Sequence, residues 1–538
     1  MTDTPRLSRR ALLAGVGAGL FATPALAAGG HDHAGHDAPK PKKAKAARAA
    51  KTPPPAGTPL VFPRLVDLGP GETFDLVAEP ATHAFLKDKP VAVVGYGGTY
   101  MGPALRLKRG VDARIRLVNR LDRPTNVHWH GALVDARLDG ATLPGLATGA
   151  AWETKLRLDQ PAATLWYHAH VHGTTARDVH DGLCGLMIVD DPAAAPAGLP
   201  ATWGVDDLPL ILQDRTFDDT GAPRLPPLAE TLEHGFRGRT MIVNGIADAL
   251  ATVPPRLVRL RLLNAAGART FRLAFEDRRS FRLIAGDGGF LPAAVPLDFL
   301  ALAPGERAEI LVDFAEGASP LLTLPDDHEH HDAGRAMTVP DVVDVAVPVL
   351  AFDVVRDERA AAPSPAVPER LATLPALPAS TLGLTRRRFE LRVAPAAADA
   401  HAGHAAHDHA AMMHGTGTGT HATADAPPAA RLSINGKPFA MGRIDETVKL
   451  GATEIWEIVS PDMAHPFHVH GAHFRVLAEG GRGPKSWNGG VKDTVLVEDS
   501  AELLVTFTRR ADADAPFLYH CHLLEHEDGG MMGTFTVG

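Results

Sequence analysis

One strand-like run occurs three times along the chain, and this repetition limits the fold more than any other feature. Residues 114–119 and 257–264 both alternate apolar with polar side chains at first, and both end in an asparagine. Residues 452–459 form a matching run. Alternation of this kind is typical of β-strands, and repetition at roughly 150 residues indicates a duplicated β-sandwich. The sequence therefore predicts an all-β protein.

Composition agrees with this prediction and narrows the function. The 538 residues include 52 glycines and 45 prolines, which favour turns. A chain with 45% hydrophobic and 22% charged residues is globular rather than disordered, and a net charge of −9 excludes a nucleic-acid binder as its overall class. Two cysteines exclude a disulfide framework, whereas 27 histidines indicate metal chemistry.

The first 58 residues contain two segments that precede the folded part. Residues 1–27 carry the paired arginines Arg9 and Arg10, then a short apolar run, then small residues. This pattern predicts a twin-arginine export signal that is removed, and the apolar run is too short and glycine-rich for a membrane anchor. Residues 28–58 are rich in His, Lys and Pro without apolar periodicity, which predicts a disordered tether. We therefore expect a periplasmic protein.

Three β-rich units should follow, separated by Pro/Ala-rich linkers. We expect cupredoxin-sized units at residues 59–195, 196–365 and 366–538. Residues 396–430 interrupt the third unit with six histidines and two methionines. Such a tract cannot build a core, so we expect it on the surface, where it could bind copper or zinc. A shorter acidic, histidine-rich tract lies at 326–332.

Four His-X-His pairs are the features that carry chemistry. In a strand, side chains at i and i+2 point to the same face, so each pair can offer two imidazoles to neighbouring metals. A single pair is weak evidence, because two half-exposed strand histidines are ordinary. Four pairs, two in the first unit and two in the third, are not explained that way. The pairs are His128 with His130, His168 with His170, His468 with His470, and His520 with His522.

The last pair encloses Cys521, which adds a thiolate. On an extended backbone Cys521 points away from the histidines on either side of it, so it can serve a different metal. His465 lies upstream, and His526 and Met531 lie downstream. Two histidines, one cysteine and a weak axial methionine are the ligands of a blue-copper electron-transfer site. The sequence therefore predicts an electron-accepting copper joined through Cys521 to a copper cluster.

In order, spacing and position these motifs resemble those of three-domain multicopper oxidases, over roughly residues 59–538. Within that family the chain is most similar to bacterial periplasmic copper efflux oxidases, also called cuprous oxidases, which are laccase-like. Supporting segments are 206–214, 487–495 and 523–532. The resemblance implies three cupredoxin-like Greek-key β-sandwiches and four copper ions. It also implies an activity: one-electron oxidation of Cu(I) to Cu(II), coupled to four-electron reduction of dioxygen to water, in copper tolerance.

The resemblance assigns each motif residue to a copper. His465, Cys521 and His526 would bind the type 1 copper, with Met531 as axial ligand. His128 and His468 would bind the type 2 copper. The two type 3 coppers would be bound by His130, His168, His170, His470, His520 and His522. The middle unit would contribute no ligand.

The resemblance also points to carboxylates. Asp139, nine residues after His130, and Glu527 occupy the family's proton-relay positions; each could instead only orient a ligand histidine. Asp462 and Met463, together with Asp399 in the insertion, are candidates for a substrate-copper site. The insertion is histidine-rich where cuprous oxidases carry a methionine-rich one, so this substrate assignment departs from the family pattern.

Other functions compete with the cuprous oxidase. A laccase-like phenol oxidase would use the same coppers with an open substrate pocket. The insertion at 396–430 is the feature that distinguishes a cuprous oxidase from a phenol oxidase. A copper carrier, a copper-free relative such as a cell-division scaffold, and a copper nitrite reductase do not need the complete ligand set. We expect a monomer whose partners are dioxygen, a Cu(I) or phenolic reductant and the twin-arginine export machinery.

Several residues near the motifs receive structural roles. We expect His172, His180 and His473 to be structural or surface histidines. Cys184 should be a small buried core residue that forms no disulfide with Cys521, because Cys521 is needed as a thiolate. Met532 should contribute packing.

Overall fold

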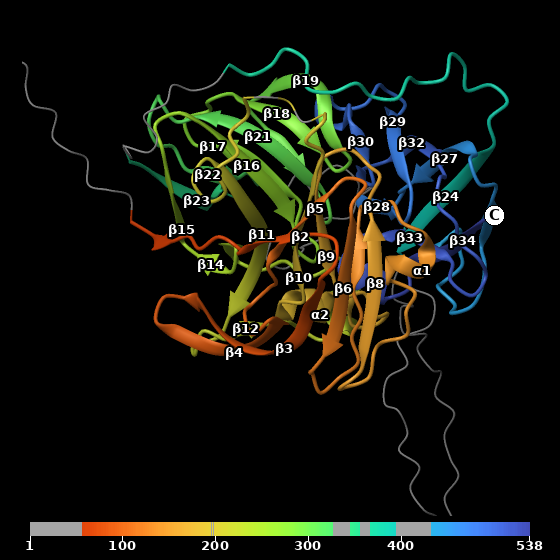
Figure 1. Cartoon of the computed structure of the whole chain (residues 1–538), viewed down its shortest axis with the longest axis horizontal. Coiled ribbons are helices and arrows are strands. Elements are labelled where there is room, and N and C mark those ends of the chain that lie inside the picture. The colour runs from red at the N-terminus through yellow and green to blue at the C-terminus, as the bar shows by residue number, and fades with distance from the viewer. Residues whose placement is uncertain (1–55, 195, 197, 326–344, 356–365, 394–431) are drawn as a thin grey trace, which may run out of the picture. The chain divides into compact units, whose positions relative to one another are not determined.

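The computed structural model describes residues 56–538 except 195, 197, 326–344, 356–365 and 394–431. In this part of the chain the strands form six sheets, which group in chain order into three pairs (Figure 1). Each pair encloses its own cluster of buried apolar side chains. The prediction of an all-β protein built from three cupredoxin-like β-sandwiches is confirmed.

The first sandwich places a four-stranded sheet over a five-stranded sheet, and its core contains Leu117, Trp129 and Leu165. Two short helices, α1 (Ala136–Asp139) and α2 (Thr175–Asp181), lie in its loops. The sheets run in space as β4 (Lys89–Tyr96), β3 (Thr73–Leu86), β6 (Asp112–Asn119) and β8 (Ala151–Arg157), and as β2 (Leu65–Leu68), β5 (Ala104–Lys108), β10 (Cys184–Asp190), β9 (Ala163–His168) and β7 (His128–His130).

The second sandwich has the larger sheets and one short helix, α3 (Leu228–Thr231). One sheet runs as β1 (Thr58–Pro59), β15 (Ala249–Val253), β23 (Val347–Val354), β22 (Leu321–Thr323), β17 (Phe271–Phe275) and β20 (Leu300–Leu302). The other runs as β14 (Ile246–Ala247), β13 (Thr240–Val243), β11 (Asp207–Phe217), β16 (Leu257–Asn264), β21 (Arg307–Asp313), β18 (Phe281–Gly286) and β19 (Gly289–Leu297), with β12 (Pro223–Arg224) on β11.

The third sandwich contains α4 (Leu524–Asp528) and a 3-10 turn, η3 (Ser486–Asn488). One sheet runs as β25 (Leu432–Ile434), β24 (Arg386–Val393), β27 (Thr453–Val459), β32 (Ser500–Thr506), β29 (His473–Glu479) and β30 (Val491–Lys492). The other runs as β26 (Glu446–Val448), β34 (Met532–Val537), β33 (Phe517–Cys521), β28 (His465–Val469) and β31 (Thr494–Val497).

The three repeated runs form the same strand of each sandwich. They correspond to β6, β16 and β27, and each has one parallel and one antiparallel neighbour. β6 lies between β3 and β8, β16 between β11 and β21, and β27 between β24 and β32. Equivalent positions in equivalent sheets support the duplication that the sequence indicates.

Strand β16 is buried on both faces, although its sequence alternates. The arginines of its polar face are buried together with carboxylate partners. Arg259 Nε donates to Glu309 (2.8 Å), and Arg261 Nε donates to Asp207 (2.7 Å). Arg261 also donates to Thr164 Oγ1 of the first sandwich (2.9 Å). Buried charges require such partners, so this face joins two sandwiches instead of facing water.

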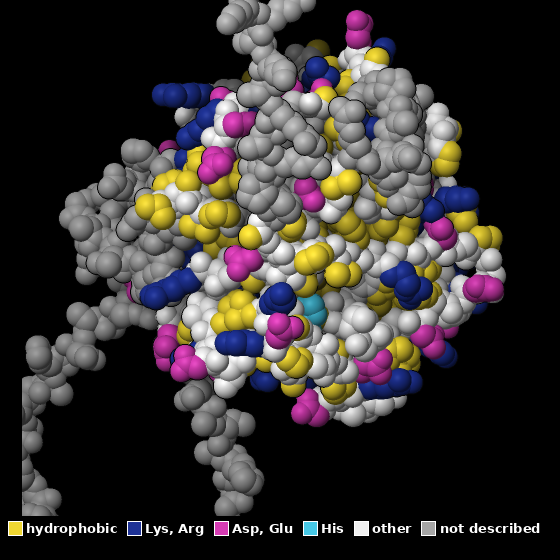
Figure 2. All heavy atoms as spheres, turned by 90° about the vertical axis from the view of Figure 1, so that its left-hand side faces the viewer, with side chains coloured by type: hydrophobic (Ala, Val, Ile, Leu, Met, Phe, Trp, Pro, Cys, Tyr) yellow, Lys and Arg dark blue, Asp and Glu magenta, His cyan; other side chains and the backbone are white. Residues whose placement is uncertain are grey.

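The chain's first described strand belongs to the second sandwich. Thr58 pairs in parallel with Ala249, so the tether predicted for residues 28–58 ends before Thr58. The predicted signal, the rest of that tether and the tracts at 326–332 and 396–430 lie outside the described residues. Within the described ranges, no helix has the length and apolar character needed to cross a bilayer. Figure 2 shows one face of the molecule, where side chains of both charges are scattered between small hydrophobic groups.

Candidate metal centre

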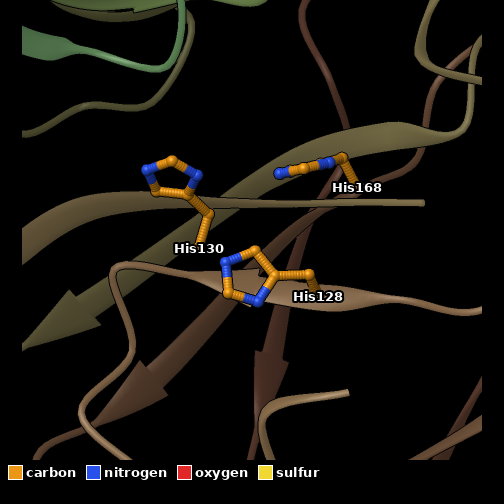
Figure 3. Close-up of side chains that lie close together, drawn as sticks. All are labelled: His128, His130 and His168. Carbon is orange, nitrogen blue, oxygen red and sulfur yellow. The ribbon is translucent and has the colours of Figure 1, made fainter. Parts of the chain in front are cut away.

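The first two His-X-His pairs lie on neighbouring strands of the first sandwich. His128 and His130 are on β7, and β9 ends at His168, which pairs directly opposite His128. Figure 3 shows the imidazoles of His128, His130 and His168 turned toward a common space. His170 follows β9, and its ring centroid lies 5.4 Å from that of His128. All four side chains are buried.

The third sandwich supplies the other two pairs in the same way. β28 carries His468, with His470 just beyond the strand, and β33 carries His520. The two strands are antiparallel, with His468 opposite His520. These three histidines and His522 are also buried.

The histidines of the first and third sandwiches meet face to face. The ring of His128 stacks on that of His470, with centroids 4.0 Å apart. His170 Nε2 lies 3.4 Å from His520 Nε2, and the His522 ring centroid lies 5.0 Å from that of His130. Three triplets have ligand atoms within 4.8 Å of one another: His128, His130 and His168; His128, His468 and His470; and His170, His470 and His520.

Unpartnered nitrogens show that this cluster fits metal ions. Buried nitrogens without a hydrogen-bond partner among the described residues include His128 Nε2, His168 Nε2 and both nitrogens of His522. Such burial is unfavourable unless another group binds them. Burial also lowers the pKa of His168, His520 and His522, that of His520 to about 3, so these imidazoles stay neutral, which is the form that binds metals.

A separate set forms around Cys521. Its thiol and the imidazoles of His465 and His526 have ligand atoms within 4.8 Å of one another, and Sγ lies 3.8 Å from His526 Nδ1. The backbone carbonyl of Met531 accepts a hydrogen bond from the Cys521 N–H (3.1 Å), and the Met531 side chain is buried in the same core. Burial raises the pKa of the Cys521 thiol, so a bound cation is required to keep the thiolate form. This donor set fits copper.

Asp139 joins the histidines of two sandwiches. It ends α1, is 2% exposed, and its Oδ2 lies 3.1 Å from His128 Nδ1 and 3.0 Å from His470 Nδ1. Both rings therefore direct Nδ1 at the carboxylate, which leaves Nε2 of each for the cluster.

Glu527 lies on the other side of the cluster. It is fully buried in α4, with Oε1 3.4 Å from His170 Nε2 and Oε2 3.3 Å from His520 Nδ1. Burial raises the pKa of this carboxyl well above its usual range.

Two polar contacts were not predicted. Ser460 Oγ lies 2.6 Å from His465 Nδ1, and the Asp493 carboxylate lies 3.1 Å from His130 Nε2. Asp493 is inside segment 487–495, which supports the resemblance, but nothing in its local sequence pattern distinguishes it from a surface aspartate. Only the folded chain brings it to His130.

Of the candidate substrate-copper residues, Asp462 and Met463 are half-buried neighbours in the third sandwich. The Asp462 carboxylate accepts hydrogen bonds from Arg392 Nη1 and from the Val393 N–H, both at 3.0 Å. Met463 is half-buried against the core of the third sandwich. Asp399 lies outside the described residues.

The residues given structural roles lie outside the donor sets, although both ring nitrogens of the buried His180 have no hydrogen-bond partner among the described residues. Cys184 and Cys521 are both free and buried, as expected. His473 Nε2 lies 3.1 Å from the Gly131 carbonyl oxygen, and the exposed His172 packs on Phe439. His180 and Met532 are buried.

Comparison with known proteins places this geometry in a family. Profiles of the multicopper oxidase family match residues 78–194 and 407–538. The chain is 32% identical to a cell division protein, FtsP, of Xenorhabdus nematophila, and 30% identical to a multicopper oxidase of Staphylococcus aureus. Each alignment covers 89% of this chain and 92% of the relative.

Solved structures agree. A laccase-like multicopper oxidase, CueO, from Ochrobactrum sp. superposes with a TM-score of 0.74 at 36% identity, over 89% of this chain and all of that chain. That protein is described as having oxidase activity toward lignin model compounds and lignosulfonate. The family profiles, the relatives and the solved structure all indicate the same family as the arrangement of the histidines. The chain belongs to the multicopper oxidase family of copper-containing oxidoreductases.

Proposed function

We propose that this protein is an exported, periplasmic cuprous oxidase that oxidises Cu(I) to Cu(II) while reducing dioxygen to water. The observation that carries the oxidase assignment is the pair of adjacent donor sets, one around Cys521 and one between the first and third sandwiches. The histidine-rich composition of the insertion supports copper as the reductant, because imidazole binds copper in both oxidation states. The expected state is a monomer exported through the twin-arginine machinery.

Four resident coppers fit the donor sets. One would be held by His465, Cys521 and His526 with axial Met531, and one by His128 and His468. The remaining pair would be held by His130, His168, His170, His470, His520 and His522. When bound, copper supplies reversible one-electron chemistry and the site of oxygen reduction.

Cys521 connects the two sets. Its side chain belongs to the set with His465 and His526, while its neighbours in sequence, His520 and His522, lie in the histidine cluster. Three consecutive residues therefore form a short covalent path for electrons between them.

Two carboxylates are positioned to deliver protons. Asp139 Oδ2 would receive and release a proton between His128 and His470, and Glu527 would do so beside His170 and His520. Oxygen reduction consumes protons in a site that excludes water, so positioned acids are required. Asp462 and Met463 remain candidates for guiding substrate copper; the Arg392 pair would have to open for Asp462 to do so.

A phenol oxidase is the second candidate, favoured by the 36% identity to the laccase-like CueO structure. A copper-free scaffold, suggested by the cell-division relatives, is disfavoured. It would leave a large set of imidazole nitrogens buried without partners, which lowers stability without benefit.

The test is oxygen uptake by the copper-loaded protein with a Cu(I) complex and with a bulky phenol, each with and without residues 396–430. We expect rapid uptake with Cu(I), slow uptake with the phenol, and faster phenol oxidation after the deletion. Fast phenol oxidation by the intact protein, indifferent to the deletion, would identify a laccase. No uptake with either substrate despite bound copper would favour a carrier.

A further inference from the structure

The second sandwich reaches the histidine cluster although none of its described residues belongs to a donor set. Glu306 directly precedes β21 and Arg307 begins that strand, and the two residues face Lys492 and Asp493 of the third sandwich. Lys492 Nζ lies 3.0 Å from Glu306 Oε1, and Arg307 pairs with Asp493 through two nitrogens, at 2.8 and 2.5 Å. All four side chains are buried. Two neighbouring ion pairs, one with its acid and one with its base in the second sandwich, therefore connect the start of β21 to the third sandwich.

Asp493 carries this contact onward to the histidines. Its Oδ1 lies 3.1 Å from His130 Nε2, and its backbone carbonyl lies 2.8 Å from His468 Nδ1. The hydroxyl of Thr494 lies 3.2 Å and 3.1 Å from the same two nitrogens. One residue thus contacts one ring from each of the two sandwiches that form the cluster.

These contacts fix which nitrogen of each ring is available. The opposite nitrogens, His130 Nδ1 and His468 Nε2, have no hydrogen-bond partner among the described residues. A ring that donates its N–H to an oxygen on one side presents a lone pair on the other. Asp493 therefore favours the tautomers in which His130 presents Nδ1 and His468 presents Nε2 to a metal.

Asp493 lies close enough to His130 and His468 for the three ligand atoms to fall within 4.8 Å of one another, but both of its oxygens already have other partners. Its oxygens lie within hydrogen-bond distance of the two terminal nitrogens of Arg307, and Oδ1 also accepts from Thr494 Oγ1 at 2.9 Å. Arg307 is oriented in turn, because it donates to the backbone carbonyls of Gly305 (2.9 Å) and Thr164 (3.2 Å). A bidentate pair of this kind fixes the plane of the carboxylate.

Two glycines show how closely the ion pair fits. Gly131 has a φ of +85°, and a Cβ there would lie 2.7 Å from both Arg307 Nη2 and Asp493 Oδ2. Gly305 has a φ of +83°, and a Cβ there would lie 2.9 Å from the His522 ring. The backbone after the first His-X-His pair and the loop of the second sandwich thus approach the cluster where no side chain fits.

We infer that Arg307 and Asp493 are positioning residues: Arg307 of the second sandwich orients Asp493, and Asp493 sets the tautomer and orientation of His130 and His468. This inference rests on the proposed copper cluster, because it assigns these two rings to the type 2 and type 3 coppers.

The test compares Asp493→Asn and Arg307→Lys with Asp207→Asn in the full-length, copper-loaded protein. Asp207 is a matched control: it is buried and pairs with Arg261 through both oxygens, at 2.7 and 2.9 Å, and it lies in the Arg259–Arg261–Glu309 network. The readouts are copper stoichiometry during titration with a competing chelator, the electron paramagnetic resonance spectrum of the type 2 copper, and the visible absorption of the type 1 copper.

We expect Asp493→Asn to weaken type 2 copper binding about 10- to 100-fold and to alter its resonance spectrum, while the type 1 absorption is retained. Arg307→Lys keeps the charge but loses the paired geometry, so a smaller change in the same direction is expected, and the two substitutions together should not be additive. Asp207→Asn should lower thermal stability and leave the copper spectra unchanged.

Type 2 binding and spectra in Asp493→Asn that match those of Asp207→Asn would overturn the inference. If Asp493→Asn does not fold, unchanged type 2 copper in Arg307→Lys would overturn it in the same way. Wild-type protein that binds fewer than four coppers would contradict the proposed function instead, before any variant is compared.

Discussion

The imidazole rings of His130 and His468 stack with their centroids 3.8 Å apart and their planes 15° apart. The two residues come from different sandwiches, from β7 and β28. The cluster therefore exists only where the first and third sandwiches are correctly joined, which couples metal binding to the assembly of the fold.

Gly131, which follows the first His-X-His pair, should be essential for the packing of the first sandwich against the third. We expect Gly131→Ala to lower stability by at least ~2 kcal/mol more than Gly149→Ala, because both positions have positive φ but only the former meets neighbouring atoms. Thermal unfolding of both variants measures the difference. Equal stabilities would contradict the close packing around Arg307.

The two cysteines should behave oppositely on substitution. Cys521→Ser should abolish the blue absorption and lower oxygen uptake by at least about 100-fold, because a hydroxyl does not replace the thiolate. Cys184→Ser, the matched control, places a hydroxyl in an apolar core and should cost about 1 to 3 kcal/mol of stability with the spectrum retained. Blue absorption in Cys521→Ser would contradict the assigned ligand set.

Asp139 should affect turnover more than copper content. Asp139→Asn keeps a side chain of the same size but carries no exchangeable carboxyl proton, so we expect kcat to fall roughly 100-fold or more with all coppers retained. Measurement combines metal analysis with oxygen uptake, and Asp139→Glu should recover part of the rate. Loss of copper in proportion to activity would show that Asp139 only orients His128 and His470.

Acid should weaken the buried ion-pair network that connects the first two sandwiches. Burial alone would raise the pKa of Glu309, but Arg259 and Arg261 lower it to about 2. A lowered folded-state pKa stabilises the fold above the unfolded-state value of 4.5, by about 3 kcal/mol, and this stabilisation is lost as the pH falls toward 2.

Glu309→Gln should therefore be less stable than the wild type at neutral pH, with a difference that shrinks below pH 4.5. The measurement is the pH dependence of thermal unfolding for both copper-depleted proteins, so that copper release does not contribute. A stability difference that does not depend on pH would show that the carboxylate charge of Glu309 is not what stabilises the contact between the two sandwiches.

Copper removal should destabilise the whole molecule. Copper that binds only the folded state contributes ~4 kcal/mol per site when its concentration is 1000 times Kd. Chelation should lower the unfolding midpoint by several degrees, and added copper should restore it. Cys521→Ser, which retains the histidine cluster, should respond less than the wild type; an identical response would place the stabilisation outside the Cys521 set.

Much of the site could be predicted from the sequence because its signals are local. The alternation of side chains along a strand identifies His128 with His130 and His520 with His522, and it separates Cys521 from its neighbours. Likewise, residues 257–264 alternate strongly at first, and they form β16 over that same range.

The sequence alone therefore determined an all-β chain with repeated strands and paired ligands, since these depend on a period of two residues. Only the tertiary structure decided that Asp493 contacts His130 across 363 positions, and that Arg307 of the second sandwich orients it. Such contacts depend on how three sandwiches pack together, and packing leaves no periodic pattern in the chain. For the same reason the alternation of residues 257–264 identifies a strand, whereas only the fold shows that Arg259 and Arg261 are buried beside Glu309.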